Sequence, residues 1–128
     1  MKIIRGESIP YSPASHENPE RPGVLKRVLA GKSELQVGRV QMVNWSWLKS
    51  GQSFRSHYHQ DMQEIFIITH GQTEMSIDGT NVSLAPGDAV IVDPGEIHSM
   101  QAVGDEDVFY VVFGISSDQG GRTVVVEP

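Results

Sequence analysis

The sequence contains no cysteine, which removes several kinds of chemistry at once. Without a thiol there is no disulfide framework, no thiolate nucleophile, and no zinc finger or iron–sulfur cluster held by cysteine. Long apolar runs are missing too: the longest, IFII at 65–68 and VFYVVF at 108–113, are far shorter than a bilayer requires. We therefore expect no membrane association.

Positive charge is also scarce, with 10 Lys and Arg against 16 Asp and Glu and a formal net charge of −6. No basic cluster is present to neutralise phosphates, so we expect no nucleic-acid partner. A single inward-facing arginine could still bind a small anion. The N-terminal segment MKIIRGESIP lacks the apolar stretch of a secretory signal, which predicts a cytoplasmic protein.

A chain of 128 residues is long enough for one domain with a hydrophobic core of its own. The segment PYSPASHENPERPG (10–23) holds four of the seven prolines, which predicts an irregular arm over 1–23 and a single domain over 24–128. The segment 24–35 has partly helical apolar spacing. It is short and rich in β-branched residues, however, which favours a strand or a single turn.

From residue 36 onward the pattern indicates β-structure, and its clearest element is a hairpin over 73–84. A two-residue turn at Asp78-Gly79 would pair Met75 with Val82 and Ile77 with Thr80. Two Pro-Gly turns follow, at 85–88 and 93–96. The pattern predicts roughly eight to ten short strands, which usually close into a sandwich, jelly roll or barrel.

Two histidines lie one residue apart in the stretch GQSFRSHYHQDMQEIFIITHG (51–71). Alternate residues of a strand face the same way, so His57 and His59 share a face, and a neighbouring antiparallel strand can return Glu64 to it. Two imidazoles and a carboxylate suit a divalent transition metal. His98, just after a rigid Pro-Gly turn, is a fourth candidate. The alternative is that these are ordinary surface residues, since short motifs often occur by chance.

The glycines around these residues carry a resemblance to a known family. The spacing of Gly51, His57, His59, Glu64 and Gly71 matches the first sequence motif of the cupins at every fixed position. A second stretch that opens at Gly87-Asp88 places Gly95 and His98 in register with the second motif. The resemblance covers about residues 36–114, and the chain is similar to small single-domain cupins. Asp93 and Ala102 depart from the second motif, at positions that do not bind metal in the family.

The resemblance implies an all-β fold, the double-stranded β-helix or jelly-roll barrel of the cupins, with the irregular arm preceding it. It also implies that His57, His59, Glu64 and His98 hold one divalent transition metal (Mn, Fe, Ni or Zn). Small cupins are generally homodimers, which predicts the same assembly here.

Further residues are candidates for binding a small-molecule ligand. Arg55 would share the face of His57 if the strand is regular, although arginine also serves structural ion pairs. Phe66 and Met100 could line an apolar pocket or belong to the core. We expect Trp45 and Trp47 to pack in the core or against a partner. His70 and His16 are expected at the surface, and the arm that carries His16 could lie over the barrel mouth.

Two functions remain open from the sequence. One is a metalloenzyme for a small polar molecule, of the dioxygenase, decarboxylase or sugar isomerase and epimerase type. In such an enzyme the metal keeps a coordination position for substrate or water. The other is a non-catalytic sugar or organic-acid binding or sensing protein with a structural metal. The sequence does not single out a general acid or base.

Overall fold

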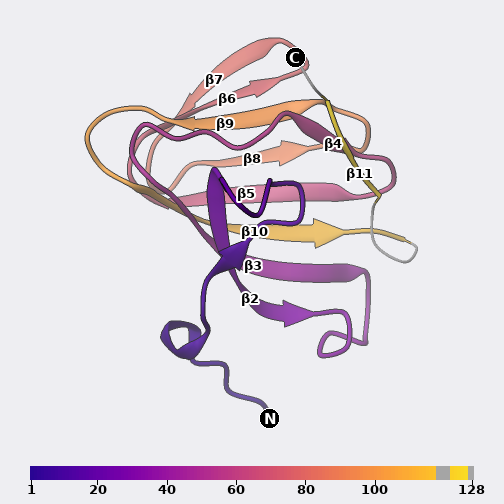
Figure 1. Ribbon diagram of the computed structural model, residues 1–128. Helices are drawn as coiled ribbons and strands as arrows, with labels where there is room; N and C mark the ends of the chain where they lie inside the picture. Colours follow the sequence, from indigo (N-terminus) through magenta and orange to yellow (C-terminus); the bar gives the residue numbers. More distant parts are fainter. Residues whose placement is uncertain (118–121, 127–128) are drawn as a thin grey trace.

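The computed structural model describes residues 1–117 and 122–126, and most of their regular structure is β-strand (Figure 1). A short 3-10 helix, Gly6–Ser8, precedes the strands. The strands are β1 (Ser12–Pro13), β2 (Val24–Gly31), β3 (Val40–Leu48), β4 (His57–His59), β5 (Gln63–His70), β6 (Thr73–Ile77), β7 (Thr80–Leu84), β8 (Ala89–Val92), β9 (His98–Ala102), β10 (Val108–Ile115) and β11 (Thr123–Val125).

The strands form two antiparallel sheets that enclose the core, as expected for a jelly roll. One sheet has six strands in the order β1-β2-β3-β10-β5-β8, and the other has five in the order β11-β4-β9-β6-β7. Strands adjacent in a sheet are often distant in sequence, as β10 is from both β3 and β5. The fold predicted from the sequence is therefore confirmed.

The hairpin of β6 and β7 has the predicted register, with Met75 opposite Val82 and Ile77 opposite Thr80. Asp78 and Gly79 both have positive φ, 48° and 82°, as the two central residues of a type I′ turn require. Met75 is fully buried, and Ile77 and Val82 pack against the core. The two-residue turn thus fixes which face of the hairpin is apolar.

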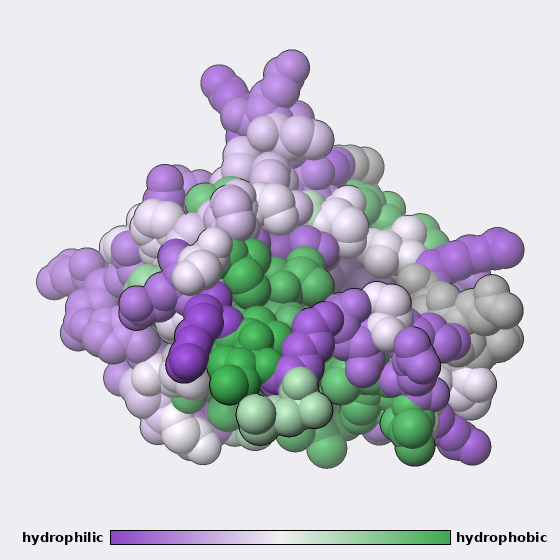
Figure 2. Space-filling view, turned by 90° about the horizontal axis from the view of Figure 1, so that it is seen from below, coloured by the Kyte–Doolittle hydropathy of each residue, from purple (hydrophilic) through white to green (hydrophobic). Residues whose placement is uncertain are grey.

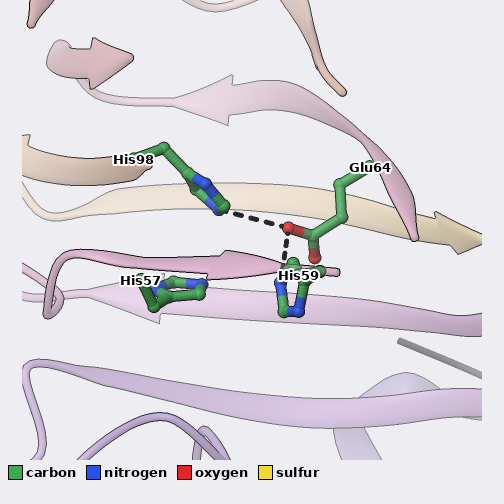
Figure 3. A group of neighbouring side chains, drawn as sticks. All are labelled: His57, His59, Glu64 and His98. Carbon is green, nitrogen blue, oxygen red and sulfur yellow. Dashed lines mark ion pairs between the residues drawn. The ribbon is translucent and has the colours of Figure 1, made fainter. Parts of the chain in front are cut away.

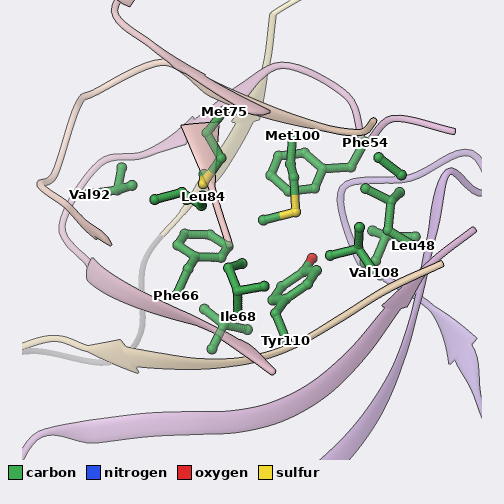
Figure 4. Packing of buried hydrophobic residues seen from close by; sticks show 14 residues of the cluster. Leu48, Phe54, Phe66, Ile68, Met75, Leu84, Val92, Met100, Val108 and Tyr110 are labelled. Carbon is green, nitrogen blue, oxygen red and sulfur yellow. The ribbon is translucent and has the colours of Figure 1, made fainter. Parts of the chain in front are cut away.

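The core lies between the sheets and is built from the inward residues of both (Figure 4). Leu48, Ile68, Met75, Met100 and Val108 are each at most 1% exposed. Burying a side chain of this kind contributes roughly 1.5–3 kcal/mol relative to leaving it in water.

The outward face of the six-stranded sheet is apolar as well. Trp45, Val111 and Ile67 lie side by side on β3, β10 and β5, and each is only half-buried. Trp45 and Trp47 share this face, as predicted, but they lie outside the core, and Tyr11 of the arm packs 5.1 Å from the Trp47 ring. Phe113 also points outward. The strands 65–68 and 108–113 are thus fully buried on one face only.

The segment expected to be irregular, residues 10–23, crosses from this outward face to the barrel mouth. Its regular structure is the two-residue strand β1, which pairs with the start of β2. The ambiguous segment that follows is a strand, as favoured from its β-branched residues.

Seen from the β2 side, apolar side chains gather in the middle of the surface with hydrophilic ones around them (Figure 2).

Candidate metal centre

Four side chains from three strands meet between the two sheets at the barrel mouth (Figure 3). His57 and His59 come from β4, His98 from β9, and Glu64 from β5 of the opposite sheet. His57 pairs directly with His98 across the β4–β9 ladder. All four are buried, with exposed fractions of 1–6%. The structure thus brings together the four residues that the motif spacing singled out.

Each imidazole makes a hydrogen-bond contact through its Nδ1 atom. Nδ1 of His57 donates to the Arg55 carbonyl at 2.7 Å, and Nδ1 of His98 donates to the Glu96 carbonyl at 2.9 Å. The His59 Nδ1 lies 3.0 Å from the Thr123 hydroxyl of β11. Because a carbonyl can only accept, the Nδ1 atoms facing carbonyls carry a proton, which leaves Nε2 as the nitrogen with which a neutral ring would bind a metal. Such outer hydrogen bonds orient metal-binding histidines.

Glu64 lies between two of these imidazoles. Its Oε1 is 2.9 Å from Nε2 of His59 and 3.3 Å from Nε2 of His98. These contacts lack hydrogen-bond geometry, and all three atoms are buried without a hydrogen-bond partner among the described residues. Buried polar atoms without partners are costly and rare, so three of them facing one point indicate a missing common partner. A cation bound by all of them is such a partner.

The protonation states of the cluster suit a cation. Burial, aided by the neighbouring His16 and His98, lowers the pKa of His57 to about 3. Burial alone would raise the pKa of Glu64, but the contacts with His59 and His98 outweigh it and lower the pKa to about 2. His57 is therefore a neutral imidazole and Glu64 a carboxylate at neutral pH. Metal binding requires both of these forms.

One ligand atom from each of the four residues lies within 4.8 Å of the other three. Three imidazoles and one carboxylate form a borderline donor set that suits a divalent transition metal rather than Mg²⁺ or Ca²⁺. The cluster could therefore hold one such ion, and its unpartnered Nε2 and Oε1 atoms fit that role.

A hollow of about 410 Å³ opens beside the cluster. Phe54, Phe66 and Tyr110 give it apolar walls, while Lys26 and Asn44 add polar groups. Its volume lies at the lower end of the range of about 300–1,000 Å³ typical of small-molecule sites. A small molecule in this hollow would reach His57, His59 and Glu64, which all line it.

The N-terminal arm forms part of this hollow. The ring of His16 stacks on the ring of His57 with centroids 3.9 Å apart and planes inclined by 17°. His16 Nδ1 donates to Oε2 of Glu17 at 3.1 Å. The expectation that His16 lies at the surface is therefore wrong, because the arm folds over the barrel mouth and holds His16 against the cluster.

The candidate ligand-binding residues are divided between two places. Phe66 lines the hollow beside the cluster. Arg55 lines a second hollow, and Met100 contributes to that one while its side chain lies in the core. The condition for Arg55 to share the face of His57, a regular strand through both, is not met, because β4 begins only at His57. His70 lies at the surface as expected, 2.9 Å from Glu106.

Sequence reasoning did not identify Lys26 and Asn44 as residues of the site. The signal was present for Lys26, which shares its parity along β2 with the buried Val24. A charged residue at a strand position whose alternate neighbours are buried and apolar points toward the interior. Asn44 similarly shares its parity along β3 with the buried Leu48.

The fold and the cluster together define a jelly-roll barrel protein with a candidate metal site. The family model described as "Cupin domain" matches residues 45–114, which is more than half of the chain. This protein belongs to the cupin family.

No curated protein matches the sequence significantly. No helix in the described part of the chain has the length and apolar character needed to cross a membrane.

Solved structures share the fold at low sequence identity. A predicted oxalate decarboxylase from Thermotoga maritima is 24% identical, with a TM-score of 0.79 over 90% of this chain and 99% of that one. The polyketide cyclase RemF from Streptomyces resistomycificus is 16% identical, with a TM-score of 0.77 over 99% and 87%. A cupin-superfamily sugar phosphate isomerase from Silicibacter pomeroyi is 18% identical, with a TM-score of 0.73 over 97% and 92%. Because proteins with this fold carry out such different chemistries, the fold does not determine the activity of this chain, which depends on the residues of its own site.

Proposed function

We propose that this chain binds one divalent transition metal through His57, His59, Glu64 and His98 and acts as an enzyme on a small molecule. The observation that carries the proposal is the convergence of buried Nε2 and Oε1 atoms that have no hydrogen-bond partner among the described residues. The ion would supply Lewis-acid polarisation of a substrate oxygen. The protein would hold the imidazoles in one tautomer, keep Glu64 ionised, and orient the substrate in the adjoining hollow.

The hollow favours catalysis over a purely structural metal. Structural sites are usually closed by protein ligands, whereas catalytic sites leave a position for water or substrate. Here three of the four proposed ligands line a hollow large enough for a small molecule. A sugar or organic-acid binding protein with a structural metal is the alternative, and it predicts a metal whose water ligands do not exchange. Water-proton relaxation of the manganese-loaded protein distinguishes the two, because an accessible ion increases the relaxation rate strongly.

Elemental analysis of protein purified without a chelating tag tests the metal site. We expect about one ion per chain in the native protein, and its loss in a His57→Ala, His59→Ala double variant. His70→Ala is the matched control, because His70 is an exposed histidine outside the cluster. A native protein that contains no metal and takes up none of Mn, Fe, Ni or Zn overturns the proposal.

We also propose that the chain forms a homodimer through the outward face of its six-stranded sheet. Ile91 on this face is 56% exposed, and Val111 and Ile67 lie in one apolar row with Trp45. An apolar face of this kind marks a protein interface, and a second copy offers an identical apolar surface. Light scattering should give twice the 14.1 kDa chain mass for the native protein and a single chain mass for Val111→Glu. Ser83→Glu, exposed on β7 of the other sheet, is the control and should remain dimeric.

A further inference from the structure

We propose that the hollow takes a small anionic polyhydroxy compound, with its negative group on Lys26 and one of its hydroxyl groups on Asn44. This inference deepens the proposed function and rests on it, because the metal is expected to bind the other end of the same molecule. Lys26 and Asn44 lie on β2 and β3 of the six-stranded sheet, whereas three of the four cluster residues come from the other sheet. The ligand would therefore lie between the two sheets.

Lys26 is an inward-facing cation. It pairs with Ser46 across the β2–β3 ladder, is half-buried, and lines the hollow. Burial lowers the pKa of its ammonium group. Among the residues that the structure describes, no carboxylate forms an ion pair with it. A lysine that is partly removed from water and forms no ion pair in the described chain is stabilised by an anionic ligand.

Asn44 is the second polar group without a partner. The residue is 7% exposed, lines the hollow, and its buried Oδ1 has no hydrogen-bond partner in the described chain. Its neighbours across the sheet, Val28 and Val112, are apolar and offer no side-chain donor. Leaving an amide oxygen unpaired inside a protein costs stability, and a buried polar residue of this kind indicates a ligand or an ordered water. An amide oxygen requires a donor, which a ligand hydroxyl group supplies.

The charges of the hollow favour an anion once the metal is bound. Glu64 is the one carboxylate that lines it among the described residues, and a divalent ion together with Lys26 outweighs that single negative charge. The ligand has to be small, since the hollow measures about 410 Å³.

Calorimetric titration of the zinc-loaded full chain with four probes tests the proposal. D-Gluconate carries both a carboxylate and hydroxyl groups, D-glucitol lacks the charge, and hexanoate lacks the hydroxyl groups. Glucose 6-phosphate carries its charge as a phosphate and tells whether that anion replaces the carboxylate. We expect gluconate or glucose 6-phosphate to bind at least about tenfold more tightly than glucitol and hexanoate, because a charge-assisted hydrogen bond is roughly twice as strong as a neutral one.

Variants then assign the contacts. We expect Lys26→Met to weaken binding of the preferred anion about tenfold or more, while Lys26→Arg retains it within a few-fold. Lys2→Met removes the same charge from an exposed position and should leave binding unchanged. Asn44→Leu should also weaken binding and yet unfold at the same or a higher temperature, because it removes a buried amide that lacks a partner. A purely structural asparagine would instead lower the unfolding temperature.

The outcomes test the anion site, the role of Asn44 and the metal site separately. If both anions bind no better than glucitol, or if Lys26→Met binds as tightly as the native chain, the anion site is refuted. If Asn44→Leu binds the anion normally, Asn44 holds only a water, and its part of the proposal is refuted. Metal content is measured on the same samples. A protein that takes up no metal but still binds gluconate through Lys26 refutes the proposed function and supports the anion site.

Discussion

Glu17→Gln is the substitution whose effect the structure predicts most sharply. The Glu17 side chain is 1% exposed and accepts four hydrogen bonds from three different segments. Oε1 accepts from the backbone N–H groups of Gly23 at 2.5 Å and Val24 at 3.1 Å. Oε2 accepts from the backbone N–H of Arg55 at 3.0 Å and from Nδ1 of His16 at 3.1 Å. One carboxylate thus joins the arm to β2 and to the segment before β4.

Glutamine keeps the shape but replaces one oxygen with an NH2 group, so two of the four donors lose their acceptor. Hydrogen bonds to a charged group contribute roughly 1.5–3 kcal/mol each, so the loss is about 3–6 kcal/mol before compensation. A neutral amide is easier to bury than a carboxylate, which offsets part of this loss. We therefore expect Glu17→Gln to lower the free energy of unfolding by about 3 kcal/mol, a large part of the 5–15 kcal/mol typical of a domain.

Urea unfolding followed by tryptophan fluorescence measures this difference. With slopes of about 1–3 kcal/mol per molar urea, the midpoint should fall by roughly 1–3 M. Glu20→Gln is the control, because Glu20 is an exposed glutamate of the same arm, and its midpoint should not move. A Glu17→Gln midpoint equal to that of the native chain would falsify the assignment of Glu17 as the anchor of the arm.

Three further predictions concern the same region. The pKa of Glu17 in the folded chain is lower than its ordinary value of about 4.5. The contribution of Glu17 to the free energy of unfolding is therefore complete above about pH 4.5, and it declines as the pH falls through the lower pKa of the folded chain. The stability gap between native and Glu17→Gln protein should therefore narrow in acid unfolding below that pH. Gly23→Ala should destabilise the chain by several kcal/mol, because its Cβ would lie 1.8 Å from the Ser53 carbonyl oxygen; unchanged thermal unfolding would contradict this. Thr123→Val should weaken metal affinity about 10- to 100-fold by removing the outer partner of His59, whereas Thr80→Val on the hairpin should not. Competition with a chelator measures both affinities.

The sequence predicted the parts of the cluster that depend on local periodicity. His57 and His59 share a face because side chains alternate along a strand, and this holds wherever the strand is regular. The rule does not apply to Arg55, because β4 begins at His57 and residue 55 lies before it. Alternation is reliable only within the strand, and sequence patterns do not fix strand ends to the residue.

The position of His98 depends on a different kind of information. His98 meets His57 because β4 and β9 pair across about 40 residues of chain, and no local pattern encodes that register. Family resemblance supplied it, since the spacing of two motifs records which strands pair. Neither local periodicity nor the family resemblance indicated the positions of Glu17 and His16. Their segment is rich in proline and has almost no regular structure, so its position follows from hydrogen bonds to distant backbone groups.

The arm links the stability of the fold to the geometry of the site. Glu17 binds the backbone N–H of Arg55, and the Arg55 carbonyl in turn accepts from Nδ1 of His57. The same carboxylate holds His16, whose ring covers one face of His57. A change at Glu17 therefore reaches the proposed metal ligand by two routes, through the backbone and through the stacked ring. Loss of the anchor should weaken metal binding even in conditions where the barrel remains folded, because orientation of His57 depends on the arm as much as on β4.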